Sequence, residues 1–296
     1  MKPAISLNNL TKMYGKDRGI EDITFDVLPG QVFGFLGPNG AGKSTAMRTL
    51  MGLISATSGT ATILGKNALQ RNSQLMSQIG YLPGVFSPYR NLTALEYLTY
   101  ISKLRKVDCV KEIEDLASRL KLNLNRHIHD LSKGNRQKVG VIQAFMHQPA
   151  VLILDEPTSG LDPIIQREFE IILESAKKRG AAVLLSSHVL SEVEHLADQV
   201  AVISDGKLLL NESIEALKSK NRHTITLEFE SPIDTSRYLN IAKVLSYQNN
   251  KLTCEVAGSE KELLKAAVSD GVIAVQTEEP SLDKIFLELL NYEVNS

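Results

Sequence analysis

The chain has 296 residues, of which 43% are hydrophobic and 23% are charged, and its formal net charge is -1. This is the composition of an ordinary globular protein, long enough for one large domain and one small domain. A nucleic-acid-binding surface usually brings a basic excess, so we expect no nucleic-acid partner. Cys109 and Cys254 stand far apart with no further ligand at metal-site spacing, which favours two reduced thiols.

The sequence predicts neither a signal peptide nor a membrane span. The residues that follow Met1 are largely polar, and the apolar runs at 151–154 and 181–185 are far shorter than the ~20 residues that cross a bilayer. We therefore expect that the chain would need another subunit to bring it to a membrane.

The first half of the sequence predicts two strands and a helix around a glycine-rich loop. Residues 20–27 alternate as in a half-buried strand, and residues 32–36 form an apolar run typical of a buried strand. A helix is predicted over residues 43–53, directly after the loop. Amphipathic helices then fill residues 92–122 without a strand pattern, which indicates a helical subdomain over about residues 85–145.

Strand patterns return in the second half, at residues 151–154, 182–185 and 200–203, with helices between them. This alternation favours an α/β fold with a mostly parallel sheet covered on both faces.

A polar stretch at residues 218–222 predicts the boundary between a domain of residues 1–220 and an appendage of residues 221–296. The appendage is predicted to be a small α+β domain. Its expected strands cover 224–229, 252–256 and 272–276, and its expected helices cover 260–269 and the residues from Pro280 onward.

One loop carries a phosphate-binding pattern, G-x-x-x-x-G-K-[ST], and it reads Gly37-Pro38-Asn39-Gly40-Ala41-Gly42-Lys43-Ser44-Thr45. Its glycines let backbone N–H groups curl around phosphate oxygens, and the helix that follows directs its positive end at them. Lys43 would then contact the β- and γ-phosphates, and Ser44 would bind Mg²⁺. A chance glycine turn is the alternative, but the flanking strand and helix favour the phosphate loop.

Two acids follow the buried strand at residues 151–154, at the strand end where open α/β sheets bind ligands. Asp155 would hold Mg²⁺ through water, and Glu156 would orient and deprotonate an attacking water molecule. A solvated acidic strand end is the alternative interpretation of this pair alone. Together with the phosphate loop, the pair predicts a P-loop nucleoside triphosphatase.

A third segment, Leu131-Ser132-Lys133-Gly134-Asn135, resembles the L-S-G-G-Q signature of the ABC (ATP-binding cassette) family of ATPases. Ser132 is a good helix N-cap, and a helix start of this kind can bind an anion. A helix that begins with a serine cap usually binds no ligand at that cap. Its place between the phosphate loop and the acidic strand end is what makes the resemblance specific.

Three further positions match the order of motifs in the ABC family. Asp162 ends a Ser-Gly-Leu-Asp loop that, in the family, meets a partner subunit, and His188 matches a histidine near the γ-phosphate and the catalytic glutamate. Tyr14 matches the aromatic that stacks on adenine. Taken singly, His188 would be interpreted as a structural histidine and Tyr14 as a core aromatic. The resemblance covers roughly residues 4–218.

The resemblance implies an ABC ATPase fold: a P-loop core with a helical subdomain and an antiparallel β subdomain, followed by the small α+β domain. It implies ATP and Mg²⁺ as cofactors, and catalytic roles for Glu156, His188 and Lys43. The implied ATP-binding residues are Tyr14, Gly37 to Thr45, Ser132, Gly134 and Asp162, and the implied Mg²⁺ ligands are Ser44 and Asp155.

The family resemblance also implies partners. ATP would be held between residues 37–45 of one copy and residues 132–134 of a second copy, so a homodimer is expected. An integral membrane permease would hold this cytoplasmic chain on the inner face of the cell membrane. The tail from Glu279 to Phe286 looks like that of ATPases serving drug, antibiotic and ion exporters, which favours export over import.

Two departures from the family pattern stand out. The family has glutamine after the proline of Ile79-Gly80-Tyr81-Leu82-Pro83, where this chain has Gly84, and the signature has Lys133 in place of a glycine. We expect water or backbone to replace the glutamine side chain, and Gly84→Gln to hydrolyse ATP about as well as the parent. Lys133 is either a solvent-facing lysine or an added charge near phosphate.

Two other classes of protein deserve comparison. ABC proteins that act on ribosomes carry two cassettes, and those that act in DNA repair carry a long coiled coil, neither of which the sequence contains. P-loop kinases lack the element at residues 132–134 and the loop that ends at Asp162. The transporter ATPase is therefore the favoured interpretation.

Overall fold

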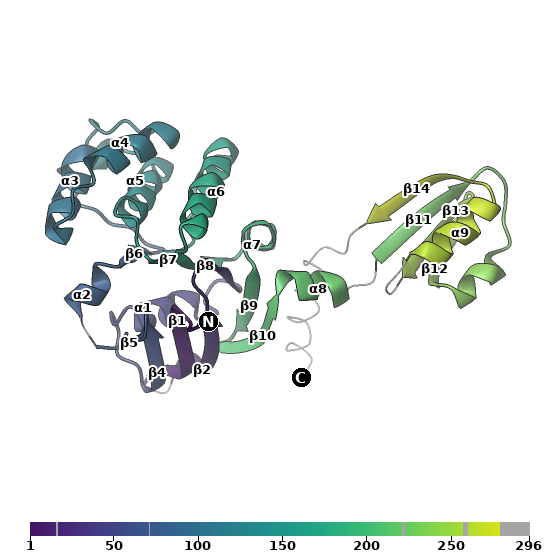
Figure 1. The fold of residues 1–296 in the computed structure, drawn as a ribbon, viewed down its shortest axis with the longest axis horizontal. Helices are drawn as coiled ribbons and strands as arrows, with labels where there is room; N and C mark the ends of the chain where they lie inside the picture. Colours follow the sequence, from purple (N-terminus) through teal and green to yellow (C-terminus); the bar gives the residue numbers. More distant parts are fainter. Residues whose placement is uncertain (16, 71, 221–222, 257–259, 279–296) are drawn as a thin grey trace. The chain divides into compact units, whose positions relative to one another are not determined.

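The computed structural model describes residues 1–15, 17–70, 72–220, 223–256 and 260–278. The chain divides into two compact units, Met1–Glu212 and Ser213–Ser296, close to the boundary proposed from the sequence (Figure 1). The helix expected from Pro280 onward lies outside the described residues. No helix in the described ranges has both the length and the hydrophobicity that crossing a bilayer requires.

A six-stranded sheet in the order β10-β9-β3-β8-β7-β6 forms the centre of the first unit. Neighbouring strands from β9 to β6 all pair in parallel, as the alternation of strands and helices predicts. The strands are β3 (Val32–Leu36), β6 (Ile79–Leu82), β7 (Val151–Asp155), β8 (Ala182–Ser187), β9 (Gln199–Ser204) and β10 (Lys207–Ser213).

An antiparallel sheet in the order β2-β1-β4-β5, together with α1 (Lys43–Leu50), packs on one face of the parallel sheet. Phe25 of the antiparallel sheet stacks on Phe33 of β3 with ring centroids 4.6 Å apart. The sequence did not predict β1, because a register shift near Asn9, whose φ is 46°, interrupts its alternation. The strands are β1 (Ile5–Tyr14), β2 (Asp17–Val27), β4 (Ser58–Ile63) and β5 (Lys66–Asn67).

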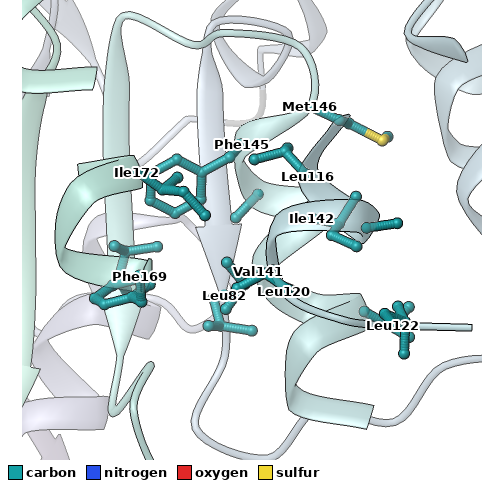
Figure 2. Close-up of a cluster of buried hydrophobic side chains, with 14 of the residues drawn as sticks. Leu82, Leu116, Leu120, Leu122, Val141, Ile142, Phe145, Met146, Phe169 and Ile172 are labelled. Carbon is teal, nitrogen blue, oxygen red and sulfur yellow. The ribbon is translucent and has the colours of Figure 1, made fainter. Parts of the chain in front are cut away.

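Helices cover the other face of the parallel sheet, as expected of a helical subdomain (Figure 1). Phe145 and Phe169 meet edge to face there, with ring centroids 6.0 Å apart, inside the apolar cluster drawn in Figure 2. The helices of this unit other than α1 are α2 (Ser73–Met76), α3 (Ala94–Arg105), α4 (Val110–Arg119), the 3-10 helix η1 (Ile128–Asp130), α5 (Lys133–Phe145), α6 (Pro163–Lys178) and α7 (Leu190–Leu196).

Successive side chains of the buried strands enter different cores. In β7, Ile153 packs on the side of the antiparallel sheet, whereas Leu152 and Leu154 pack beneath the helices. Because both faces of the parallel sheet are covered, these strands are continuous apolar runs. Polar groups that could do chemistry are therefore found at the strand ends or just beyond them.

The second unit is a four-stranded antiparallel sheet in the order β12-β13-β11-β14, with α9 packed on one face. Its sequence of elements and its strand order are those of the ferredoxin-like, split βαβ arrangement. The sequence did not predict β12, whose side chains are all partly or fully exposed. The elements are α8 (Ile214–Lys220), β11 (His223–Phe229), η2 (Thr235–Asn240), β12 (Lys243–Gln248), β13 (Lys251–Val256), α9 (Lys261–Ser269) and β14 (Val272–Glu278).

The start of β6 is held by two basic side chains from the helical layer. Arg105 of α3 donates to the carbonyls of Met76 and Ile79, each at 3.2 Å, and His147 Nε2 lies 3.2 Å from the same Ile79 oxygen. Burial, together with the nearby Arg105 guanidinium, lowers the pKa of His147 from 6.5 to about 4. The histidine is therefore neutral in the folded protein at pH values where an unfolded chain would protonate it.

This pKa difference predicts a pH-dependent stability. Between about pH 6.5 and about pH 4 the unfolded chain binds a proton at His147 and the folded chain does not, so stability should decrease as the pH falls through this window. The contribution should be on the order of 2 kcal/mol. Urea unfolding of the parent and of His147→Gln at several pH values measures it. An equal loss of stability in both proteins would contradict the assignment.

Candidate functional site

Four adjacent strands bring the predicted site residues to one edge of the parallel sheet. In the order β3-β8-β7-β6, the residues at or just after the carboxyl ends are Gly37, His188, Asp155 with Glu156, and Gly84. The sheet order β10-β9-β3-β8-β7-β6 places β3 between β9 and β8, so the numbering of the strands falls to β3 and rises again at β8. Ligands of open α/β sheets bind where the strand order reverses in this way.

The glycine-rich loop turns sharply before α1. Gly40 and Gly42 have φ values of 85° and 110°, in the region that favours glycine, and a Cβ on Gly42 would lie 2.8 Å from the Gly19 oxygen. Lys43 is 5% exposed, and its Nζ donates to the carbonyls of Gly37 at 2.6 Å and Pro38 at 3.1 Å. The lysine head therefore lies inside the loop.

Burial lowers the pKa of Lys43, and the nearby carboxylates of Glu156 and Asp155 act in the opposite direction. An ammonium group that is removed from water and flanked by two acids is a strong local charge, because little solvent screens it. The position suits the binding of an anion.

Asp155 is 1% exposed, and both oxygens of its carboxylate accept hydrogen bonds. Ser44 Oγ donates to Oδ2 at 2.6 Å, the Gly84 N–H donates to Oδ2 at 3.3 Å, and Ser186 Oγ donates to Oδ1 at 2.5 Å. A carboxylate and a hydroxyl oxygen side by side form a donor set that suits Mg²⁺, which takes one or two protein oxygens and completes its shell with water and phosphate. The described residues contain no cluster of three or more His, Cys, Asp and Glu side chains for a metal.

Glu156 occupies a strained backbone position at the mouth of the site. Its φ is 51°, unusual for a residue with a side chain, and its N–H donates to the Ser186 carbonyl at 3.2 Å. The carboxylate lies between two basic groups, with Oε2 3.0 Å from His188 Nδ1 and Oε1 3.8 Å from Lys43 Nζ. The structure thus joins Lys43, Glu156 and His188 in one connected set.

Ser132, Gly134 and Asp162 form a second group. Ser132 caps α5 by accepting from the Asn135 N–H at 3.2 Å, and Asp162 caps α6 by accepting from the Ile165 N–H at 3.1 Å. A Cβ on Gly134 would lie 2.4 Å from the Gly160 oxygen, so the helix start packs tightly on this loop. Within the described residues, no hydrogen bond or ion pair joins this group to the phosphate loop of the same chain.

Tyr14 ends β1 with 49% of its surface exposed. A Cβ on Gly19 would lie 2.8 Å from the tyrosine ring, and the Gly19 oxygen in turn lies against Gly42 of the phosphate loop. Lys12 Nζ lies 5.1 Å from the ring centroid. An exposed ring near the loop could accept a base by stacking.

Sequence reasoning missed several supporting residues. Ser186 bonds Asp155, and Gln137 Nε2 donates to the carbonyls of Glu156 and Pro157, each at 3.1 Å. Glu192 Oε2 accepts from Thr158 and Ser187, each at 2.9 Å. The Ser-Ser pair at the end of an apolar strand, directly before His188, was the one local signal that could have identified part of this network.

Comparisons with known proteins agree with this geometry. A family model described as "ABC transporter" matches residues 20–159. The bacitracin transport ATP-binding protein BcrA of Bacillus licheniformis is 34% identical over 98% of this chain and 98% of its own length. The chain belongs to the ATP-binding subunits of ABC transporters.

Two further similarities support the family assignment of this ABC ATPase. The lantibiotic transport ATP-binding protein SrtF of Streptococcus pyogenes is 37% identical over 71% of this chain and 91% of its own length. A solved structure of an ATP-binding subunit of an ABC transporter superposes with a TM-score of 0.68 at 28% identity, covering 73% of this chain and 92% of the other. The family and the ATPase activity predicted from the motifs are confirmed.

The two residues that depart from the family pattern, Gly84 and Lys133, both lie within the described part of this ABC ATPase. Lys133 Nζ lies 3.5 Å from Ser159 Oγ on the exposed surface. The Gly84 N–H donates to Asp155 Oδ2, and a Cβ on Gly84 would lie 2.8 Å from the same oxygen. Gly84→Gln would therefore require the buried Asp155 carboxylate to move, and its unchanged rate of ATP hydrolysis stays a prediction.

Proposed function

We propose that this ABC ATPase binds Mg²⁺ and ATP at the carboxyl edge of its parallel sheet, works as a homodimer and drives export through a membrane permease. The observation that carries the site is a pair of neighbouring bonded groups: Ser44 donates to Asp155, and the next residue, Glu156, lies between Lys43 and His188. These residues come from the phosphate loop and from the ends of two strands, β7 and β8, so their convergence is a property of the fold.

In this proposal the loop Gly37–Thr45 binds the phosphates through backbone N–H groups. Lys43 turns from the carbonyls of its own loop toward the β- and γ-phosphates, which offer its ammonium group a full negative charge. Tyr14 stacks on the adenine. Because Lys43 is buried, its attraction to the phosphates is stronger than it would be in water.

Ser44 and Asp155 would hold Mg²⁺ through their adjacent oxygens. The ion would neutralise charge on the β- and γ-phosphate oxygens. Ser186 keeps Asp155 oriented by donating to its other oxygen.

Glu156 accepts the proton of the attacking water in this scheme. His188 Nδ1, 3.0 Å from Oε2, orients the carboxylate, and Lys43 Nζ lies 3.8 Å from Oε1. The left-handed backbone at Glu156 directs its side chain out of the strand and toward the loop.

A second copy would complete the nucleotide site. Ser132, Gly134 and Asp162 are exposed or partly exposed and have no contact with the loop of their own chain among the described residues, so they are free to face the nucleotide bound by a partner copy. ATP would link the two copies, and loss of the γ-phosphate would weaken the link, because a ligand shifts an equilibrium by its differential affinity for the two states.

Lys43→Ala tests the phosphate contacts. Removing this charge should lower the ATPase rate on the order of 10²- to 10³-fold, as for other preorganised electrostatic contacts. Release of phosphate from ATP, followed with Mg²⁺ present, measures the effect. Lys178→Ala, on an exposed face of α6, is the matched control. An unchanged rate in Lys43→Ala would refute the proposed role.

Glu156→Gln tests the base and the dimer together. The amide keeps the shape of the side chain but cannot take a proton, so the variant should bind ATP, hydrolyse it slowly and accumulate as an ATP-bound dimer. Size-exclusion chromatography with ATP and with ADP would show the dimer with ATP alone. Normal turnover would show that another group is the base, and a monomer in both conditions would contradict the proposed dimer.

A groove of about 920 Å³ between the end of α1, α2 and α3 supports a membrane partner. Leu53 and Leu104 line it and are 55% and 61% exposed, while Arg105 and Lys106 add positive charge. An amphipathic cytoplasmic helix of a permease fits such a surface. Docking there would hold this ATPase on the cytoplasmic face of the membrane, and relatives named for bacitracin and lantibiotic transport favour export.

Leu104→Glu tests this partner. Capture of the tagged parent from detergent-solubilised membranes of its own cells should recover a polytopic membrane protein, and the variant should recover much less, because a charge would enter an apolar contact. Ile171→Glu, at a similarly exposed apolar position on α6, should recover as much as the parent. Recovery of ribosomes instead of a membrane protein would overturn the transporter proposal in favour of a translation-associated ABC protein.

A further inference from the structure

Glu192 lies in the first turn of α7 and accepts two hydrogen bonds on a single carboxylate oxygen. Its Oε2 accepts from Thr158 Oγ1 and from Ser187 Oγ, each at 2.9 Å. Both donors are buried, with 6% of Thr158 and 3% of Ser187 exposed. A hydrogen bond to a carboxylate away from water is stronger than one between neutral groups, so Glu192 ties these two residues together.

Thr158 belongs to the turn that carries Glu156. The Ser159 N–H donates to the Glu156 carbonyl at 3.2 Å, so Thr158 lies inside this turn. The backbone φ of Glu156 is 51°, a conformation that persists in a residue with a side chain only when surrounding contacts hold it. The bond from Thr158 Oγ1 to Glu192 is one of those contacts.

Ser187 holds the backbone on both sides of His188. It comes directly before the histidine, and its Oγ accepts from the Val189 N–H at 2.9 Å while it donates to Glu192. A hydroxyl has one hydrogen and two lone pairs, so it makes both bonds at once. Because Glu192 directs the hydrogen of Ser187, the turn around His188 depends on this carboxylate.

Glu192 itself stands on a fixed support. The next residue, Val193, is fully buried, and a Cβ on Gly34 of β3 would lie 2.2 Å from Val193 Cγ1. This close approach leaves α7 no room to move toward the parallel sheet. A carboxylate on such a helix can serve as a fixed point for the two loops that are bonded to it.

The contact between Glu156 and His188 needs support of this kind. The two side chains are 24% and 46% exposed, and Glu156 Oε2 lies 3.0 Å from His188 Nδ1. An ion pair that is open to solvent holds its own geometry weakly, so the backbone on each side must set it. The position matters for rate, because a misplacement of about 1 Å can cost on the order of 100-fold.

We propose that Glu192 is a positioning residue for the contact between Glu156 and His188. It acts through Thr158 and Ser187, and its own carboxylate takes no part in proton transfer. This inference rests on the proposed roles of Glu156 and His188 in ATP hydrolysis. It gives α7 a part in placing the base, which the spacing of the motifs does not show.

Glu192→Ala removes the acceptor of both hydroxyls. We expect kcat for ATP hydrolysis with Mg²⁺ to fall on the order of 10- to 100-fold. KM for ATP should stay close to the parent value, because the phosphate loop is untouched. Ser191→Ala, at an exposed position on the same helix, is the matched control and should hydrolyse ATP like the parent. A parent-like kcat in Glu192→Ala, or a loss seen mainly in KM, would overturn the inference.

Glu192→Gln separates position from charge. Its amide oxygen can still accept from both hydroxyls, so most of the rate lost in Glu192→Ala should return. A glutamine variant as slow as the alanine variant would show that the charge or the proton of Glu192 matters, contrary to the inference.

Thr158→Val and Ser187→Ala each remove one donor and decide the question should Glu192→Ala fail to fold. Each should lower kcat and leave KM for ATP close to the parent value. A parent-like kcat in both variants would show that the bonds to Glu192 do not position the site.

A double-mutant cycle tests whether Glu192 acts through the proposed contact. In His188→Ala the contact is absent, so the addition of Glu192→Ala should lower kcat by a much smaller factor than it does in the parent. An equal factor in both backgrounds would show that Glu192 acts elsewhere.

The single variants of the contact residues separate this inference from the proposed function. If Glu156→Gln and His188→Ala both hydrolyse ATP at the parent rate, the proposed function of the site is wrong. If both are slow and Glu192→Ala is not, the proposed function stands and the role of Glu192 is wrong.

Discussion

The buried carboxylate of Asp155 is the point on which the site depends. A charged group removed from water is costly unless hydrogen bonds satisfy it, and here Ser44, Ser186 and the Gly84 N–H do so. These donors come from the phosphate loop, from β8 and from the connection that leads to the helical layer. One side chain thus fixes the relative positions of three parts of the unit, and none of the three could move without changing its hydrogen bonds.

The charged groups around Asp155 are in contact with one another in the structure. Lys43 is buried within its loop, where burial lowers its pKa and the two carboxylates act against that change. Glu156 is held between Lys43 and His188 by a backbone that few residues with side chains adopt. A carboxylate held in this way needs little rearrangement when charge develops nearby, which is how preorganised sites lower barriers.

The remaining surfaces fit a protein that works with others. The group around Ser132 and Asp162 makes no contact with the phosphate loop of its own chain among the described residues. The groove beside Leu104 exposes apolar surface that an isolated protein gains nothing from exposing. The ferredoxin-like second unit has a buried apolar core of its own, to which α9 contributes. A unit with its own core can fold as a separate domain attached to the ATPase.

The sequence by itself determined the family and proposed most residues of the candidate site, because the phosphate loop, the Asp155-Glu156 pair and His188 stand at fixed spacings beside buried strands. Only the tertiary structure decided how they are joined. It showed that Ser186 and Gly84 complete the bonding of Asp155, and it identified β1 and β12, whose patterns are interrupted or exposed. The physical reason is that strand pairing and backbone N–H contacts depend on residues distant in the chain, and a glycine amide leaves no trace of its partner in the sequence.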